Sequence, residues 1–305
     1  MAKEKKTEVI EQKSVLEEIF PGENSPKIKI TPEDFQNILQ YFSPTGEFET
    51  VALEVHKDSL QVITHNVTNN ISAKFSGINE DIEIINTGYF IFDVKDTLDK
   101  ISRKYKDVDI LWVEWKPGSK IRITDGDGKN PVNITPKTVN SVNQSKKDRG
   151  MVFENKLLQF NKKDGRQTVL EDGKPVKVPA NTRFKIEQDE LLRGINDAKN
   201  VDANNVIYHF SEKESYCVAG LWNKKGDDSR TDDLKISEFE GEIFEDAIPL
   251  SGLELAKLLS GTIDVQCNTT NYDVEPPLAG TITFSQWNDL GEIHYGIRVD
   301  KKAED

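Results

Sequence analysis

Histidine and cysteine, the usual carriers of metal-ligand and nucleophilic chemistry, are few and scattered in this chain. The four histidines are His56, His65, His209 and His294. None stands in an HExxH or Cys/His spacing that would hold zinc. No GxxxxGK loop and no pairing of a nucleophile with a base is visible. The turn DGDGKN begins at Asp125, and its twelfth position is Pro136, where a calcium loop needs glutamate. The sequence therefore predicts no enzyme, no metal site and no cofactor.

A different chemistry is indicated by VKDTLDKISRKYK, residues 94–106. The chain carries a formal net charge of −13, yet this stretch holds five basic residues against two acidic ones. At about 100° per residue, a helix places its apolar residues on one face and Lys100, Arg103 and Lys104 on the opposite face. Lysine and arginine attract phosphate groups without regard to base sequence. The stretch therefore indicates a helix with an apolar back and a cationic front.

The composition limits where such a helix works. A length of 305 residues is comfortable for two domains. No apolar run approaches the roughly 20 residues of a membrane span, and the first residues lack the apolar core of a signal peptide. We expect a cytoplasmic location, on the nucleoid, or in the host cytoplasm or nucleus if the chain is viral. Cys217 and Cys267 are interpreted as reduced core thiols. The acidic balance disfavours a protein that wraps nucleic acid over its whole surface.

One order of secondary-structure elements, a strand, a helix and further strands, occurs four times along the chain. KIKI, from Lys27, leads into TPEDFQNILQYF, where Thr31 suits an N-cap and Pro32 the first helical turn. Three strand-like runs follow: FETVALEV, SLQVITH and NNISAKFSG. The same order recurs around the basic helix, around EQDELLRGINDAKNV and around LSGLELAKLLSG. Helix starts fall near residues 31, 95, 187 and 250. This periodicity predicts a duplicated unit in each of two similar halves.

The predicted fold class is α+β, with two similar domains, each of two β-α-β-β-β units, and helices on one face of antiparallel sheets. The predicted parts are an N-terminal tail (1–26), an N-terminal domain (27–160) with an insertion at about 126–150, a connector (161–181), a C-terminal domain (182–300) and an acidic tail (301–305).

The outward face of the first helix is nearly uncharged, while those of the other three carry cations: Lys100, Arg103, Lys104, Arg193, Lys199 and Lys257. Each cation alone is most simply part of a solvated helix face. Their recurrence on repeated units favours a polyanion that is surrounded rather than gripped, and no element for reading bases is apparent.

The order of elements, KIKI-TPEDFQNILQYF near the start and DLGEIHYGIRV near the end resemble the sliding clamps of the proliferating cell nuclear antigen type, including archaeal and viral relatives. The resemblance covers residues 27–125 and 151–299. It implies a head-to-tail ring of three two-domain subunits, with helices around duplex DNA and sheets outside. It also implies a non-enzymatic processivity factor in DNA replication. Its partners would be DNA polymerase, a clamp loader and other clients that carry short hydrophobic or aromatic motifs.

The resemblance also carries two sets of residues across by position. The subunit interface would use MVFENKLLQF and DLKISEF, with Val152, Phe153, Leu157, Leu158, Leu234, Ile236 and Phe239. The client-peptide pocket would use Val67, Ile71, Val169, Leu170, Pro277, Tyr295 and Ile297. Gly296 stands where the family often has a further aromatic residue, which implies a shallower pocket.

Three alternatives stay open at this point. The tail stretch KSVLEEIF places Leu16, Ile19 and Phe20 at the spacing of clamp-docking peptides, although a plain helical arm also explains it. A monomeric viral processivity factor would hold DNA on an open basic face, with a steeper salt dependence. A β-rich structural or carbohydrate-binding protein would instead use exposed tryptophans for stacking: Trp112, Trp115, Trp222 and Trp287.

Overall fold

The computed structural model describes residues 15–43, 48–66, 71–137, 166–171, 174–179, 182–220, 229–231, 233–268 and 280–299. Several positions named above lie outside the described residues: Val67, Val152, Phe153, Leu157, Leu158, Trp222 and Pro277.

The N-terminal half contains two helix-centred units after a short leading helix, α1 (Val15–Ile19). The first unit is β1 (Lys27–Ile30), α2 (Pro32–Gln40), β2 (Thr50–Val55), β3 (Leu60–Asn66) and β4 (Ile71–Gly77). After β5 (Glu83–Asn86), the second is β6 (Gly88–Asp93), α3 (Val94–Lys104), β7 (Leu111–Glu114), β8 (Ile121–Asp125) and β9 (Val132–Ile134).

The C-terminal half repeats this order after a strand pair in the predicted connector, β10 (Arg166–Glu171) and β11 (Lys174–Pro179). Its first unit is β12 (Thr182–Glu187), α5 (Gln188–Asn200), β13 (Asn205–Phe210), β14 (Ser215–Gly220) and β15 (Ser229–Thr231). After β16 (Ile236–Gly241), the second is β17 (Phe244–Pro249), α6 (Leu250–Leu253) with η3 (Glu254–Leu258), β18 (Thr262–Asn268), β19 (Thr281–Asn288) and β20 (Gly291–Arg298). The predicted α+β duplication is confirmed.

Side-chain caps start the helices of the N-terminal half where the sequence predicts. The Thr31 hydroxyl accepts a hydrogen bond from the Asp34 backbone N–H at 3.0 Å, and Asp93 caps α3 in the same way. Pro32 occupies the first position of α2. Such caps satisfy backbone donors that have no partner inside the helix.

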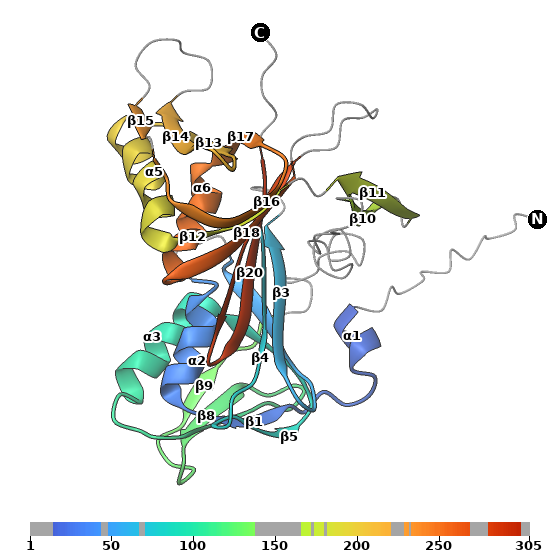
Figure 1. Cartoon of the computed structure of the whole chain (residues 1–305). Coiled ribbons are helices and arrows are strands. Elements are labelled where there is room, and N and C mark those ends of the chain that lie inside the picture. The colour runs from blue at the N-terminus through green and yellow to red at the C-terminus, as the bar shows by residue number, and fades with distance from the viewer. Residues whose placement is uncertain are drawn as a thin grey trace, which may run out of the picture.

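One nine-stranded sheet joins the two halves of the chain, in the order β16-β12-β18-β19-β20-β4-β3-β2-β6 (Figure 1). At its centre the last strand, β20, pairs antiparallel with β4, from Glu292 opposite Ser76 to Ile297 opposite Ile71. We call this β4–β20 pairing the seam. Each half also has a smaller sheet, β5-β1-β7-β8-β9 in the N-terminal half and β15-β14-β13-β17 in the C-terminal half, and the β10–β11 pair is a separate sheet.

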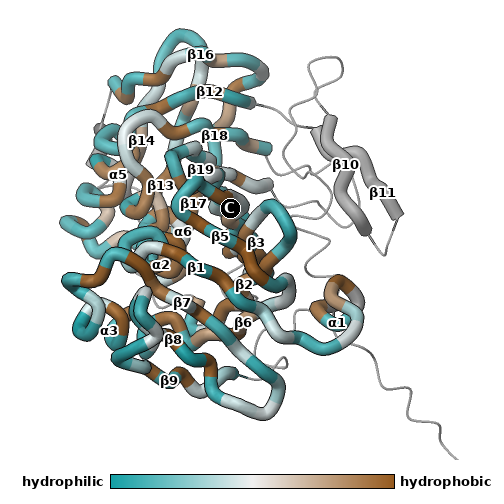
Figure 2. The backbone as a smooth tube through the Cα atoms, turned by 90° about the horizontal axis from the view of Figure 1, so that it is seen from below, coloured by the Kyte–Doolittle hydropathy of each residue, from teal (hydrophilic) through white to brown (hydrophobic). Residues whose placement is uncertain are grey.

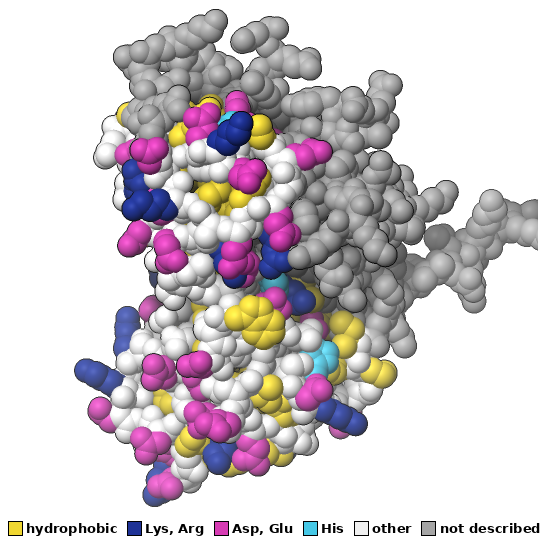
Figure 3. All heavy atoms as spheres, in the orientation of Figure 1, with side chains coloured by type: hydrophobic (Ala, Val, Ile, Leu, Met, Phe, Trp, Pro, Cys, Tyr) yellow, Lys and Arg dark blue, Asp and Glu magenta, His cyan; other side chains and the backbone are white. Residues whose placement is uncertain are grey.

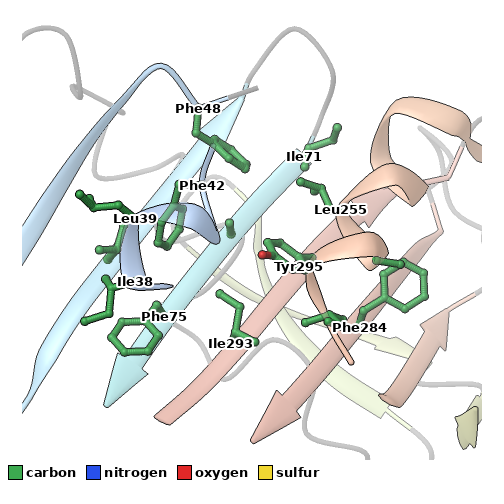
Figure 4. Packing of buried hydrophobic residues seen from close by; sticks show 14 of the residues in the cluster. Ile38, Leu39, Phe42, Phe48, Ile71, Phe75, Leu255, Phe284, Ile293 and Tyr295 are labelled. Carbon is green, nitrogen blue, oxygen red and sulfur yellow. The ribbon is translucent and has the colours of Figure 1, made fainter. Parts of the chain in front are cut away.

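The helices pack on the seam from one side. Phe75 of β4 and Tyr295 of β20 point into the same layer as Leu39 of α2 and Leu255 of η3 (Figure 4). Tyr295 is fully buried and donates its hydroxyl hydrogen to the Tyr41 carbonyl at the end of α2, at 2.8 Å. Hydrophobic and hydrophilic residues alternate along many of the strands (Figure 2). A continuous core therefore spans both halves.

Part of the range predicted as an insertion, residues 126–150, is regular structure. Strand β9 lies inside this range and pairs with β8, with Ile134 opposite Ile121. The DGDGKN stretch is the turn between them, held by a hydrogen bond from the Lys129 N–H to Asp125 Oδ1 at 2.6 Å. Only Val132 and Ile134 alternate in this three-residue strand, which is too short a pattern to recognise among Asn, Pro and Thr.

Candidate nucleic-acid interface

The six predicted cations lie on the helical layer: three on α3, two on α5 and Lys257 on η3. Helices α2 and α3 contact each other, as do α5 and η3. Both pairs lie on the same side of the nine-stranded sheet (Figure 1). The repeat thus places the cationic residues on one side of the molecule.

On α3 the three cations have different surroundings. Lys100 Nζ lies 2.6 Å from Asp96 Oδ2, one helical turn earlier. Lys104 Nζ donates to the carbonyl of Pro131, next to β9, at 2.8 Å. Arg103 is exposed, and its guanidinium makes no ion pair or hydrogen bond within the described part of the chain. Arg103 is therefore the cation of α3 most available to an external anion.

On the C-terminal helices each cation has a carboxylate beside it. Lys199 Nζ and Lys257 Nζ lie 2.5 Å and 3.0 Å from the same oxygen of Glu254. The hydrogen bond from Lys199, with a further one from Lys257, holds the pKa of Glu254 below its ordinary value. Arg193 Nη1 lies 2.7 Å from Glu190 Oε2. Exposed pairs of this kind contribute little stability, and a phosphate competes with the carboxylate for each cation.

The space-filling view agrees with this mixed electrostatic pattern. Lys and Arg side chains are interspersed with Asp and Glu over the face that Figure 3 shows. A continuous basic patch is not present among the described residues of that face. Because carboxylates lie beside Lys100, Arg193, Lys199 and Lys257, the helical layer is suited to weak, exchangeable contacts with a polyanion rather than to a tight grip.

Three residues predicted for the client pocket are core residues instead. Ile71, Tyr295 and Ile297 are at most 1% exposed. Ile297 packs against α6, where a Cβ added to Gly252 would lie 2.6 Å from its Cγ2. Successive side chains in a strand point to opposite faces, and the prediction chose the face that the helices cover. These three side chains therefore do not line an open pocket on the other face of the seam.

The face of the seam away from the helices carries their sequence neighbours. His294 lies opposite Lys74 in the register, and Gly296 opposite Ser72. The two connector residues of the predicted pocket, Val169 and Leu170, lie in β10 opposite Val176 and Pro175. Of these outer residues, His294 and Lys74 are partly exposed, whereas Ser72 and Gly296 are buried.

A chain of three polar groups lies on this outer face and was missed in the sequence. Ser285 Oγ lies 2.8 Å from His294 Nδ1, and His294 Nε2 lies 2.9 Å from Glu292 Oε1. Burial lowers the pKa of His294, although Glu292 opposes this shift. The signal was the β19–β20 hairpin, whose register sets Ser285 opposite His294.

This Ser–His–Glu chain has the order of a nucleophile, a base and an acid. Strand β19 pairs with β18 on one side and β20 on the other, so the backbone around Ser285 is engaged in the sheet. Free N–H donors that would stabilise an oxyanion are therefore not directed at the hydroxyl. The arrangement fits a polar brace across the hairpin better than a catalytic site.

The described residues of the predicted subunit interface also contribute to the core. Leu234 is 4% exposed, and Ile236 and Phe239 pack partly buried against the same cluster. Phe239 stacks on Phe184 of β12, with ring centroids 6.4 Å apart. The other predicted strand, residues 151–160, lies outside the described residues. Among the described strands, β9 and β15 each lie at an open edge of a smaller sheet.

The predicted tryptophan platform is reduced in the structure. Trp112 and Trp115 are partly buried, and each donates its indole N–H to a backbone carbonyl, that of Gly126 and Ser119 respectively. Trp287 is 71% exposed.

Within the described residues, no cluster of histidine, cysteine, aspartate and glutamate is arranged to hold a metal ion. None of the helices described has the length and apolar character needed to cross a membrane.

Neither a protein-family model nor a curated protein matches the sequence. Solved structures do match its fold. A. fulgidus PCNA, bound to the C-terminal region of FEN-1, matches with a TM-score of 0.63 and 11% identity over 92% of this chain and 100% of that one. PCNA from Thermococcus kodakaraensis matches with a TM-score of 0.62 and 12% identity over 90% of this chain and 100% of that one.

A bacterial clamp matches over less of its own length. The DNA polymerase III beta chain from Streptococcus pneumoniae has a TM-score of 0.62 and 14% identity, with 92% of this chain and 66% of that chain covered. The chain therefore spans just under two thirds of the bacterial protein. At these identities the likeness concerns backbone architecture, and the chain has the DNA clamp fold.

Proposed function

We propose that this protein is a DNA sliding clamp, a non-enzymatic processivity factor that encircles duplex DNA and tethers DNA polymerase and other DNA-processing proteins. The observation that carries the proposal is the match between the two open sheet edges, β9 and β15, and the two strands already joined in the seam. The clamp fold of the solved neighbours supports the same conclusion.

The strand orders explain the match. The nine-stranded sheet consists of five strands ending in β20, joined to four strands beginning with β4. The smaller sheets are five strands ending in β9 and four strands beginning with β15. By position in the repeat, β9 corresponds to β20 and β15 corresponds to β4. Pairing β9 of one copy with β15 of the next would therefore build a second nine-stranded sheet of the same order.

Such pairing joins two different surfaces of identical subunits, a heterologous contact that forms a ring when its rotation closes. It would also remove the open edges, which otherwise invite unspecific pairing. We propose a ring of three copies, with the helices on the inside. This assignment replaces the interface drawn from residues 151–160 and 233–239.

The helical layer would then face DNA. Retention would come from the closed ring, so phosphate contacts need not be strong. The carboxylates beside Lys100, Arg193, Lys199 and Lys257 keep each contact exchangeable, which suits movement along the duplex. Arg103 would contact phosphate without displacing a carboxylate.

Clients would bind on the opposite side of the sheet. A. fulgidus PCNA binds the C-terminal region of FEN-1 in the solved complex, so this fold accepts a terminal segment of another protein. We propose that clients with short hydrophobic or aromatic motifs dock beside the seam, where the partly exposed His294 faces outward from β20. Val67, Val169, Leu170 and Pro277 remain proposed walls of that site.

Negative-stain imaging of the purified protein tests the proposal directly. The expected particles are six-lobed rings around an open hole, because three chains would each supply two halves. Isolated two-lobed particles at micromolar concentration would contradict the closed ring. They would favour the monomeric factor with an open basic face, and steep salt dependence of duplex binding would then be measured next.

A further inference from the structure

The N-terminal helix α1 is docked on the outer face of the N-terminal half (Figure 1). Leu16 is 3% exposed, and Phe20, one turn later, packs partly buried beside it. The Phe20 N–H donates to the Leu16 carbonyl at 2.9 Å, which sets the two side chains on one face. Ile19 is 40% exposed. The helix is therefore held by two anchors four residues apart.

The anchors contact a surface that we call the arm groove: Ala52, His56, Tyr89, Ile91 and Trp115. Phe20 lies over it, with ring centroids 5.1 Å from His56 and 6.1 Å from Tyr89. The Tyr89 and Trp115 rings lie 6.1 Å apart. Aromatic rings at these separations attract each other beyond the burial of their area.

Strands β2 and β6 each place an apolar residue on the outer face, Ala52 and Ile91, beside the buried carboxylate of Glu54, whose Oε2 lies 3.4 Å from His56 Nε2. Ala52 and Ile91 point to α1, while their neighbours Leu53, Phe90 and Phe92 point into the main core. A sheet face turned to solvent normally carries polar residues in these alternate positions. The apolar outer face is therefore built to be covered.

The connection between α1 and β1 is fixed close to the groove. Asn24 Nδ2 donates to the Tyr89 carbonyl at 3.0 Å, and the Tyr89 N–H donates to Asn24 Oδ1 at 2.8 Å. The Asn24 side chain thus replaces a neighbouring strand at the edge of β6. Gly22, between Asn24 and the helix, has φ of +118° and no heavy atom within 4 Å of an added Cβ. The helix can therefore turn away at Gly22 while Asn24 stays bound.

A helix of five residues is not stable alone, because nucleating a turn is unfavourable in water. Its conformation depends on the two anchors. Contacts of this size are exchangeable, and a matching helix from another protein would make the same ones. The occupant of the arm groove is thus a short helical segment with leucine and an aromatic residue at i and i+4.

We propose that the arm groove is a second peptide-docking site, for a partner helix with leucine and an aromatic residue four apart, and that α1 occupies it in cis until displaced. The site goes beyond the proposed function. It lies at β2 and β6, separated from the seam by β3, so a client could use either surface.

The cis occupant sets the expected affinity. A segment tethered by a short linker acts at an effective concentration in the millimolar range. A free peptide that binds the empty groove with a dissociation constant of about 10 µM would thus bind the occupied groove roughly 100-fold more weakly. Releasing the arm should therefore raise peptide affinity strongly.

The test uses a fluorescent peptide of residues 13–22, KSVLEEIFPG, titrated into the full chain. The variant Leu16→Ala/Phe20→Ala should bind one peptide per chain, at least about tenfold more tightly than wild type. The matched control Ile19→Ala should behave as wild type, because Ile19 is not an anchor. Adding Ala52→Lys to the released variant should abolish binding, since its side chain would lie under the helix.

Thermal unfolding of each variant establishes that the fold is intact. A folded released variant that does not bind the peptide would overturn the proposal. Peptide binding that survives Ala52→Lys would also overturn it, because the peptide would then lie elsewhere. Light scattering gives the third outcome. If wild type assembles through the arm and the released variant does not, the occupant is the arm of a second copy and the cis arrangement is wrong.

Discussion

The seam and the two open edges are built from strands in the same positions of the repeat, but they differ in pairing. In the seam, β4 and β20 are paired over six residues and covered by α2 and η3. At β9 and β15, strands in the same positions of the repeat are paired on one side only, among the residues that the structure describes. Under the proposed ring, one chain carries both a completed strand pairing and the two edge strands of a second pairing.

The difference also indicates where stability and assembly are each decided. The seam binds strands that are more than 200 residues apart in the sequence, so its free energy belongs to folding. A joint between β9 and β15 would belong to association, and its strength would depend on concentration. Changes in the seam should therefore unfold the chain, whereas changes at the edges should separate chains that stay folded.

The largest expected effect comes from emptying the seam. Tyr295→Ala removes a fully buried ring and should lower the free energy of unfolding by about 3–5 kcal/mol. Tyr295→Phe keeps the ring and loses only the hydrogen bond to the Tyr41 carbonyl, which should lower it by about 1 kcal/mol. Urea denaturation measures both. Equal losses for the two variants would mean that the hydroxyl, not packing, holds the seam.

The next effect comes from closing an open edge. Neighbouring residues in a strand direct their N–H groups to opposite sides. One of the two variants Val132→Pro and Asn133→Pro therefore removes an N–H donor on the free side of β9. In that variant the dissociation constant of the ring should rise about tenfold, which corresponds to about 1.4 kcal/mol. The melting temperature of the single chain should stay unchanged. Analytical ultracentrifugation measures the ring, with Ile85→Pro in β5 as the control edge. An intact ring in both β9 variants would remove β9 from the interface.

The sequence predicted the helices well, but it predicted neither the pairing in the seam nor strand β9. Local signals were sufficient for the helices, because a cap such as Thr31 and a period such as Phe35, Ile38 and Leu39 are contained within one element. The seam was not predictable from such signals, because pairing Tyr295 with Ala73 needs contacts across the whole chain. Strand β9 was missed because two alternating residues make too short a pattern.

The pocket error had a physical cause that the sequence contains. In GEIHYGIR, Ile293, Tyr295 and Ile297 alternate with Glu292, His294 and Gly296, and only the apolar set suits the core. Position alone assigned Tyr295 and Ile297 to the pocket, against this alternation. The Ser285–His294 contact required the hairpin register as well, because the two residues lie on different strands.

A smaller effect is expected from a change in the helical layer, which should alter DNA binding rather than assembly. Glu254→Gln removes the carboxylate that Lys199 and Lys257 share, so both cations become available to phosphate. Duplex binding should tighten several-fold, and log K should fall more steeply with log salt, by up to about 0.9 for each further phosphate that a released cation neutralises. Fluorescence anisotropy with a labelled duplex measures both quantities.

The matched control for this change is Glu33→Gln on α2. The Glu33 carboxylate makes no ion pair within the described ranges, so its loss removes the same charge without freeing a cation. An equal increase in affinity in both variants would show that net charge alone governs DNA binding. An increase confined to Glu254→Gln would show that this carboxylate competes with DNA for the lining cations.

The smallest effect concerns the outer face of the seam. Burial lowers the pKa of His294 from its ordinary value of 6.5, so the folded chain favours the neutral ring. As pH falls below 6.5, the unfolded chain takes up the proton first, and the contribution of His294 to stability is lost until pH reaches the folded pKa. His294→Gln should therefore flatten the pH dependence of the free energy of unfolding as pH falls below 6.5. Ser285→Ala keeps the buried imidazole and should retain the slope. If His294→Gln leaves the slope unchanged, groups away from the seam cause it, and the outer face would be electrostatically separate from the core that closes the seam.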